Sequence, residues 1–272
     1  MKKRFLIALL CCAVLTSESQ EPYRLDAKTE GILLGSAVLF SGITLILNQQ
    51  IEPLTVEQIE NLDKEDICRL DRGATRYWSG DAYRRSNVGE GIPIGFASAS
   101  VLVIPALTDH PVGYGRELLT LMVMLAETNL LASSMTHMVK NSSLRIRPYV
   151  YNPDISMDLK QKTGARKSFT SGHVTTSAAN SFFFARVFSD YFPESKFKPL
   201  VWSLAAAFPA WTGVERYLAG RHFPTDIIGG YATGALCGIL IPQLHQKKLP
   251  ANLSFYPVSG PRHSGVGMTL TF

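Results

Sequence analysis

The sequence has little charge for its length. Of its 272 residues 18% are charged, where an ordinary soluble domain has about a quarter. The 27 basic residues exceed the 22 acidic ones by only five, and no basic stripe or aromatic-interleaved basic run occurs. We therefore expect no nucleic-acid partner. The apolar share of 46% excludes a disordered chain, and the length allows a single enzyme domain.

Cysteine is also scarce, with four residues in the chain. Cys11 and Cys12 lie near the amino terminus, and neither follows the small residues that lipoprotein processing prefers. The other two are Cys68 and Cys237. Export would allow this pair to form a disulfide, but two cysteines do not establish one.

The amino terminus has the layout of a secretory signal. A basic start precedes an apolar run from Phe5 to Leu15 and a short polar stretch. The apolar run is too short to span a bilayer comfortably, so we predict that residues 1–19 are a signal peptide. No A-x-A cleavage site is present, and an uncleaved interfacial anchor stays the alternative.

Six apolar segments favour helices, and most are rich in the small and hydroxyl residues that suit close helix packing. They are residues 31–48, 92–107, 118–139, 174–192, 200–214 and 227–241. We predict an all-α fold, a six-helix bundle with the active site at one end and a short C-terminal β-hairpin. The mean hydropathy of +0.08 is low for a chain made mostly of lipid-facing spans, and only residues 31–48 form a convincing span alone.

The composition divides the chain into four regions. Residues 1–19 are the signal peptide, residues 20–91 the first apolar helix and a polar connecting region, residues 92–243 the core bundle, and residues 244–272 the C-terminal tail. We expect a short surface helix in the connecting region. In the tail, two alternating runs flank a Ser-Gly-Pro turn and predict the hairpin.

Three polar clusters lie at helix ends rather than within helices. Residues 140–148 follow the third helix, residues 168–173 open the fourth, and residues 215–226 join the fifth and sixth. In an up-and-down bundle these ends lie together. The clusters therefore bring basic residues and two histidines to one pocket.

Such a pocket suits a phosphoryl group. Arginine binds phosphate oxygens bidentately and lysine acts as a point charge, so Lys140, Arg147 and Arg216 are candidates to hold three oxygens. Ser171 and Gly172 lie where the fourth helix begins, and free N–H groups and the helix dipole favour an anion there. Gly172 also lets the backbone approach a ligand closely.

Two histidines and one aspartate provide the acid and base groups. His222 and Asp226 are four residues apart around a helix start, a spacing that puts both side chains on one side. A carboxylate on one imidazole nitrogen fixes the tautomer and frees the other nitrogen to attack phosphorus. His173 is then available as the acid that protonates the leaving oxygen.

Together the three clusters resemble the type 2 phosphatidic acid phosphatase superfamily, which includes bacterial acid phosphatases, membrane lipid phosphatases and vanadium haloperoxidases. The resemblance covers roughly residues 92–241, and three motifs in order at helix ends are specific where one alone would be weak. The matching residues are Lys140, Arg147, Pro148, Ser171, Gly172, His173, Arg216, His222 and Asp226.

The resemblance implies a metal-independent phosphomonoesterase with a phosphohistidine on His222, which Asp226 orients while His173 serves as acid and then base. It implies no cofactor, and vanadate is expected to bind as a phosphate mimic. The phosphate-binding residues would be Lys140, Arg147, Ser171, Gly172 and Arg216.

The chain departs from the family pattern at two positions. Thr170 stands where Pro is usual, which should matter little because Thr is itself a good helix-entry residue. Glu215 stands where Ser is usual. We expect its carboxylate to repel the phosphate or to neutralise Arg216.

Several charged residues near or within the helices do not match the motifs. We expect solvated rim charge for Arg145, Arg221, Arg166 and Lys167. Within the third helix, Glu127 and His137 are interpreted as a satisfied polar pair, with a proton relay as the alternative.

We expect an exported, membrane-associated, periplasm-facing enzyme of the bacterial cell envelope. Its partner would be a phosphorylated lipid or a small phosphate ester: phosphatidic acid, phosphatidylglycerophosphate, an isoprenyl pyrophosphate or a lipid A type. The alternatives are a periplasmic acid phosphatase of soluble substrates, a vanadium haloperoxidase and a catalytically silent membrane module. Lysines at the end opposite the motifs favour a cytoplasmic position for that end.

Overall fold

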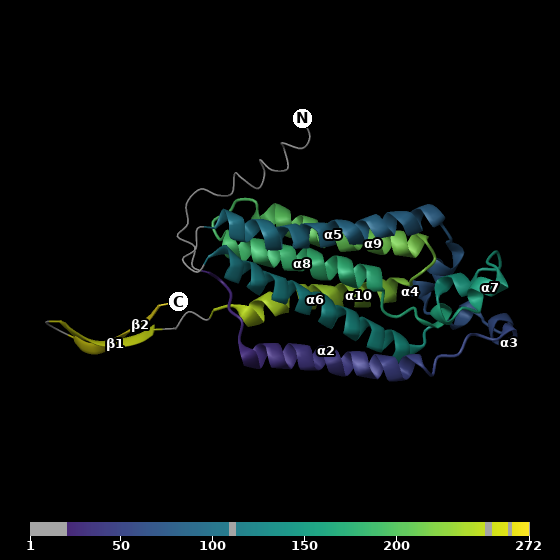
Figure 1. Ribbon diagram of the computed structural model, residues 1–272, viewed down its shortest axis with the longest axis horizontal. Helices are drawn as coiled ribbons and strands as arrows, with labels where there is room; N and C mark the ends of the chain where they lie inside the picture. The colour runs from purple at the N-terminus through teal and green to yellow at the C-terminus, as the bar shows by residue number, and fades with distance from the viewer. Residues whose placement is uncertain (1–20, 109–112, 248–251, 261–262, 272) are drawn as a thin grey trace, which may run out of the picture.

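The computed structural model describes residues 21–108, 113–247, 252–260 and 263–271 (Figure 1). The predicted signal peptide, residues 1–19, lies outside them. The predicted helical bundle is present, but the described residues form nine α-helices rather than six. The long helices are α2 (Ala27–Asn48), α5 (Gly80–Leu107), α6 (Tyr114–Ser143), α8 (Gly172–Tyr191), α9 (Lys198–Leu218) and α10 (Pro224–His245).

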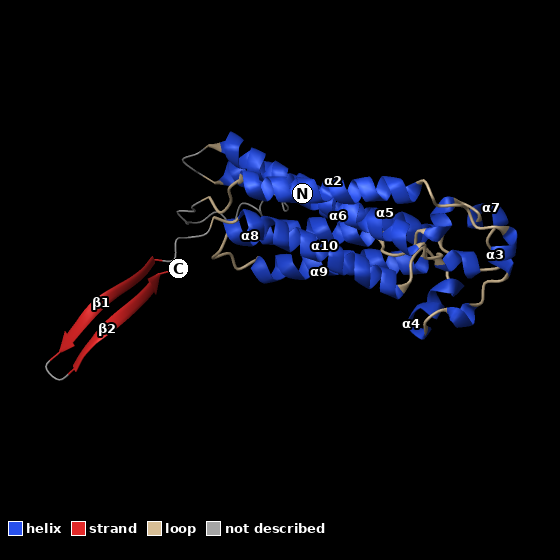
Figure 2. Cartoon of the chain, turned by 90° about the horizontal axis from the view of Figure 1, so that it is seen from below, coloured by secondary structure: helices blue, strands red, loops and turns tan. Residues whose placement is uncertain are grey.

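The three additional helices are short and lie together at one end of the bundle (Figure 2). They are α3 (Val56–Glu60), α4 (Arg69–Arg72) and α7 (Met157–Lys160). Helices of four or five residues are too short to show an apolar period, so hydropathy does not reveal them. A capping box at Thr55 stabilises the start of α3. The Thr55 hydroxyl accepts a hydrogen bond from the Gln58 N–H, and the Gln58 side-chain oxygen accepts one from the Thr55 N–H.

The helix α5 begins twelve residues before the predicted start at residue 92. The Ser79 hydroxyl caps it by accepting a hydrogen bond from the Ala82 N–H at 3.2 Å. Its first turns carry polar side chains that contact other helices, among them Ser86 and Asn87. A helix whose buried face is polar at one end escapes a search for apolar segments.

The helix α8 lies at the centre of the bundle and packs against α5, α6, α9 and α10. Its closest approach is to α10, which presents Gly230, Gly234 and Gly238 to it at every fourth position. A Cβ at any of these would collide with a backbone oxygen of α8 or of its capping residue Ser171. The glycines therefore set the distance at which the two helix starts meet.

Among the described residues, four helical segments are long and apolar enough to cross a membrane, where the sequence indicated one. They are residues 27–48, 80–107, 114–151 and 224–245. Their outward faces are apolar: Val38 is 70% exposed, Leu102 55% and Leu236 58%. Outward apolar faces of this kind suit contact with lipid chains.

Four short 3-10 helices flank α4 and α7: Lys64–Asp66, Gly73–Arg76, Pro148–Tyr151 and Thr163–Arg166. The β-structure lies at the end away from α3 and α7. Tyr23 forms an isolated bridge with Gln246 just after α10. The strands β1 (Asn252–Gly260) and β2 (His263–Thr271) pair antiparallel beyond the bundle (Figure 1). Cys68 is exposed and Cys237 is buried, and both are free thiols.

Candidate active site

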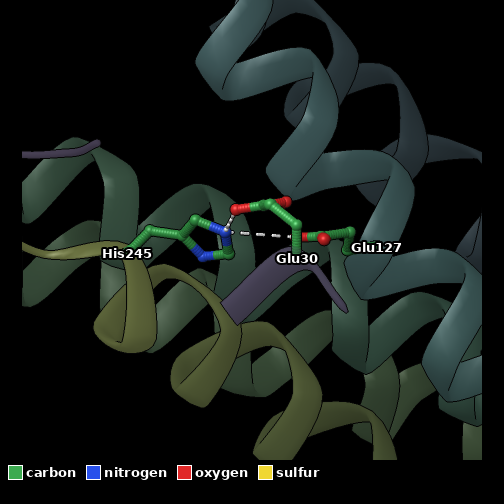
Figure 3. A group of neighbouring side chains, drawn as sticks. All are labelled: Glu30, Glu127 and His245. Atoms are coloured by element: carbon green, nitrogen blue, oxygen red, sulfur yellow. Dashed lines mark hydrogen bonds and ion pairs between the residues drawn. The ribbon is translucent and has the colours of Figure 1, made fainter. Parts of the chain in front are cut away.

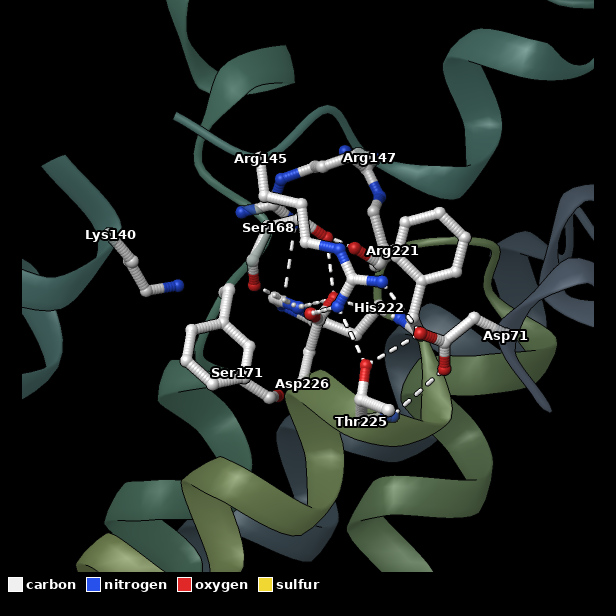
Figure 4. Close-up of polar contacts among 12 residues, drawn as sticks. Asp71, Lys140, Arg145, Arg147, Ser168, Ser171, Arg221, His222, Thr225 and Asp226 are labelled. Carbon is white, nitrogen blue, oxygen red and sulfur yellow. Dashed lines mark hydrogen bonds and ion pairs between the residues drawn. The ribbon is translucent and has the colours of Figure 1, made fainter. Parts of the chain in front are cut away.

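The three motif clusters meet where α6 ends and α8 and α10 begin (Figure 4). His222 lies in the turn between α9 and α10 and is 1% exposed. Lys140 and Arg216 are also buried, at 7% and 3% exposure. The structure thus brings one candidate nucleophile and the predicted cations into one buried cluster.

The imidazole of His222 is fixed through its Nδ1 atom. That atom lies 2.8 Å from the carbonyl oxygen of Ser168, which can only accept, so Nδ1 carries the proton. The Nε2 lone pair is then free and lies 3.5 Å from Nη1 of Arg147. Burial first, and then the charges of Arg147 and Lys140, lower the pKa of His222 well below its ordinary 6.5. The ring is therefore a neutral base that presents Nε2 to the cations.

Asp226 orients His222 indirectly. Its Oδ2 atom lies 3.6 Å from Nδ1 of His222, beyond a hydrogen bond, whereas the sequence indicated direct contact. Instead Oδ2 accepts from the Ser168 hydroxyl at 2.6 Å and from the Phe223 N–H at 2.9 Å. The carboxylate thus holds Ser168, whose carbonyl holds the ring.

Arg145 is not the solvated rim charge that the sequence indicated. Its Nη1 donates to Asp226 Oδ1 at 2.5 Å and to the Thr225 hydroxyl at 2.7 Å, and its Nη2 donates to Asp71 Oδ2 at 2.6 Å. Asp71 is 1% exposed and also accepts from the Thr225 N–H in the first turn of α10. Sequence reasoning missed Asp71, because nothing in the polar connecting region marks it.

The predicted phosphate-binding cations lie near His222, since the charges of Arg147, Lys140 and Arg216 all lower its pKa, after burial. The Arg147 Nε donates to the Gly164 carbonyl at 2.9 Å, which fixes the guanidinium. Lys140 Nζ lies beside Gly172, 3.7 Å from where a Cβ would stand. Arg216 Nη1 reaches the Ser86 hydroxyl at 3.3 Å, and its Nε has no partner among the described residues. These buried cations leave donors available for an anion.

The start of α8 offers fewer free backbone N–H groups to an anion than the sequence indicated. The Ser171 N–H donates to the Asp226 carbonyl at 3.0 Å and is not free for a ligand. The Ser171 hydroxyl, in contrast, is buried with no partner within the described part of the chain. Gly172 is the first residue of α8, where the helix leaves its N–H without an intrahelical partner. One hydroxyl is thus left without a partner among the described residues, and the helix start lies beside Lys140.

His173 contacts α5. Its Nε2 lies 2.9 Å from Asn87 Oδ1 and 3.4 Å from Glu90 Oε2. An amide oxygen only accepts, so Nε2 carries a proton there. The sequence did not indicate either partner, because both lie in the part of α5 that hydropathy missed.

The other charged residues near the motifs differ from one another. The Arg221 guanidinium lies 4.9 Å above the Trp78 ring and 5.0 Å above the Tyr83 ring, so it is held by aromatic faces rather than solvated. Lys167 donates to Asn48 at the end of α2. Arg166 is half-buried.

Glu215 does not neutralise Arg216. Its Oε1 accepts from Arg85 Nε at 2.9 Å and from Trp211 Nε1 at 3.2 Å. The Arg85 side chain is 49% exposed and lies on α5. The carboxylate of Glu215 therefore has its own counter-ion, and the charge of Arg216 stays available to the site.

The comparisons with known proteins agree on one family. Residues 117–250 match the PAP2 superfamily. This match covers just under half of the chain. The motif residues Lys140 to Asp226 lie within the match, whereas Asp71 and Asn87 lie before it.

Two relatives of the PAP2 domain are named phosphatases. A lipid A 1-phosphatase of Rhizobium johnstonii is 41% identical over 76 residues, 28% of this chain and 27% of that protein. A phosphatidylglycerophosphatase B of Bacillus subtilis is 32% identical over 81 residues, 29% of this chain and 40% of that protein. The matches thus span less than half of each relative.

One solved structure is also similar to this chain. It is the crystal structure of a transmembrane PAP2-type phosphatidylglycerolphosphate phosphatase from Bacillus subtilis, 21% identical, with a TM-score of 0.45. The superposition covers 77% of this chain and 95% of that one.

The Arg145 network predicts a stability effect. Arg145→Gln leaves the buried carboxylates of Asp71 and Asp226 without their cation, so we expect a loss of about 3 kcal/mol in unfolding free energy. Thermal unfolding in detergent measures it. Arg69→Ala, an exposed arginine of α4, is the matched control and should change stability by less than about 0.5 kcal/mol. Equal behaviour of the two variants would refute the network.

The position of Glu215 predicts its effect on anion binding. Because Arg85 already neutralises Glu215, we expect Glu215→Ser to leave the vanadate dissociation constant within about threefold of wild type. Arg216→Ala, which removes a donor, should weaken vanadate binding tenfold or more. Competition titration measures both constants. Markedly tighter vanadate binding by Glu215→Ser would mean that Glu215 does neutralise the site.

Proposed function

We propose that the chain is a metal-independent phosphatase that hydrolyses phosphate monoesters or pyrophosphates of membrane lipids through a phosphohistidine on His222. The observation that carries this proposal is the geometry of His222. Its Nδ1 proton is committed to the Ser168 carbonyl, while Nε2 is neutral and faces Arg147. A nucleophile aimed into buried cations is the arrangement that attack on a phosphate anion requires.

In the first step the Nε2 lone pair of His222 forms a bond to phosphorus as the bond to the leaving oxygen breaks. His173 donates a proton to that oxygen, which leaves as an alcohol or a phosphate. Lys140, Arg147 and Arg216 bind the equatorial oxygens, where negative charge gathers.

In the second step water attacks the phosphorus atom. His173 now accepts the water proton, the bond between nitrogen and phosphorus breaks, and inorganic phosphate leaves with His222 restored. Asp226 acts through Ser168 to hold the Nδ1–H tautomer during both steps.

Two features support a lipid substrate. Apolar helices long enough to cross a membrane carry the site at their ends, with apolar side chains facing outward. The similar proteins are named for lipid A and phosphatidylglycerophosphate. We propose an envelope membrane enzyme whose site faces outward, because Lys196, Lys198 and Lys247 lie at the opposite end.

Phosphate release from a panel of substrates tests the proposal. The panel contains phosphatidic acid, phosphatidylglycerophosphate, an isoprenyl pyrophosphate, a lipid A 1-phosphate and a soluble aryl phosphate. We expect turnover of at least one lipid, unchanged by chelators, and a loss of about 1,000-fold or more in His222→Ala.

The other outcomes of this assay identify the alternatives. Turnover of the aryl phosphate alone would indicate a soluble-substrate acid phosphatase. Halide oxidation by peroxide after vanadate loading would indicate a haloperoxidase. A wild-type preparation no more active than His222→Ala would indicate a silent membrane module.

The lowered pKa of His222 predicts the acid limb of the pH profile. Its neutral form persists as pH falls below 6.5 and is lost only when pH passes the lowered pKa. Lys140→Gln removes one of the charges that lower this pKa, so the acid limb of kcat/KM should move to higher pH.

The control is Lys167→Gln, which removes a charge that donates to Asn48 instead. Both variants are measured on one substrate, so that the titration of the substrate phosphate is the same in each profile. An unmoved limb in Lys140→Gln, or an equal shift in Lys167→Gln, would contradict the assignment of the limb to His222.

A further inference from the structure

A second polar cluster lies within the bundle, and Figure 3 shows its three side chains. It comprises Glu30 in the first turn of α2, Glu127 in α6 and His245, the last residue of α10. Asp226 and His245 are separated by nearly the whole of α10, about 28 Å at 1.5 Å per residue. The PAP2 chemistry proposed above does not use this cluster.

The sequence had paired Glu127 with His137, which is wrong. His137 is exposed, and its Nδ1 lies 2.8 Å from the Ser133 carbonyl of its own helix. Glu127 points inward instead, toward α2 and α10 (Figure 3).

Two carboxylates converge on one nitrogen atom. His245 Nε2 lies 2.9 Å from Glu30 Oε1 and 3.2 Å from Glu127 Oε2. The three ligand atoms all lie within 4.8 Å of one another. One nitrogen has at most one proton, so it cannot satisfy both carboxylates equally.

The cluster also leaves buried carboxylate oxygens unsatisfied. Glu127 is 3% exposed, and its Oε1 has no hydrogen-bond partner among the described residues. Oε2 of Glu30 is likewise buried without one there. Two anionic side chains beside one imidazole, inside an apolar bundle, require a further positive charge.

The tautomer of His245 indicates which kind of cation can supply the further positive charge. Its Nδ1 lies 2.8 Å from the Ile241 carbonyl, which only accepts, so Nδ1 carries the proton. In the neutral ring Nε2 is then a lone pair that faces two carboxylates. An imidazole with one nitrogen held by a backbone carbonyl and the other turned toward carboxylates is the usual form of a metal-binding histidine.

We propose that Glu30, Glu127 and His245 bind a divalent first-row transition-metal ion of the Zn²⁺ type. The Nε2 to oxygen separations of 2.9 and 3.2 Å are close to the edge of about 3.3 Å of a tetrahedron with metal–ligand bonds of about 2.0–2.1 Å. One nitrogen and two oxygens favour Zn²⁺ or Mn²⁺ over Ca²⁺, which takes six or more oxygens.

The role of this ion is structural. The helix α2 has few buried residues, with Leu33 and Ala37 as its buried positions, and it packs mainly on α6. An ion held by one ligand from each of α2, α6 and α10 ties the peripheral helix to the core. It neutralises the carboxylates at the same time, so no net charge stays buried.

Metal binding by the purified full-length chain tests the proposal. The protein in detergent is stripped with a chelator and titrated with Co²⁺, whose visible spectrum reports nitrogen and oxygen ligands, and then with Zn²⁺. We expect one equivalent of Co²⁺, displaced by Zn²⁺, and a higher Tm in the presence of Zn²⁺.

Matched variants locate the ion. Glu127→Gln and Glu30→Gln keep the shape of the side chain but should weaken Co²⁺ binding 100-fold or more and abolish the Tm increase. His137→Ala, which removes an exposed histidine of the same α6, should keep both. If Glu127→Gln does not fold, the test uses Co²⁺ binding by Glu30→Gln, whose change lies on the peripheral helix α2, and the Co²⁺ spectrum of the wild-type protein.

Three results would overturn the proposal. They are no Co²⁺ uptake by wild type, uptake without change of Tm, and equal binding by Glu30→Gln and His137→Ala. The cluster would then be an imidazolium that shares its proton with the two carboxylates.

Discussion

The carboxylate of Asp226 joins three segments that are far apart in the chain. It accepts hydrogen bonds from Ser168, before α8, from the Phe223 N–H at the start of α10, and from Arg145 after α6. Because the group is fully buried, it needs all of these donors to be stable as an anion. The position of His222 follows from this constraint, since Ser168 holds the imidazole by its carbonyl.

Asp226 is a buried anion that needs donors, whereas the buried cations of the site need an anion. Lys140, Arg147 and Arg216 lie near one another while Asp226 is already matched by Arg145, and in the proposed function a phosphate dianion completes their charge balance. Burial and the same charges lower the pKa of His222 and so favour its neutral form. In the proposed mechanism these charges would both bind the anionic substrate and help to keep the nucleophile deprotonated.

The sequence predicted what apolar periodicity and motif spacing encode. The six long helices and the meeting of their motif-bearing ends follow from those patterns, because helices joined by short loops lie antiparallel. Asp71 and Arg145 are 74 residues apart, and their contact depends on how the polar connecting region folds over the start of α10. The partner of Glu127 depends on helix rotation, which set His245 rather than His137 against it. Composition and motif spacing predict neither the contact of Asp71 with Arg145 nor the partner of Glu127.

The relative positions of the site residues depend on how α8 and α10 pack inside the bundle. Gly230, Gly234 and Gly238 of α10 let the α8 backbone approach closely. This approach brings the Ser171 nitrogen to 3.0 Å from the Asp226 carbonyl oxygen. A larger residue at Gly230 would meet the Ser171 carbonyl at 2.6 Å and push the start of α8 from the start of α10. Such a shift would part Ser171, Gly172 and His173 from His222. The proposed catalysis by fixed charges would tolerate little displacement, so the glycines of α10 matter to the site together with its charged residues.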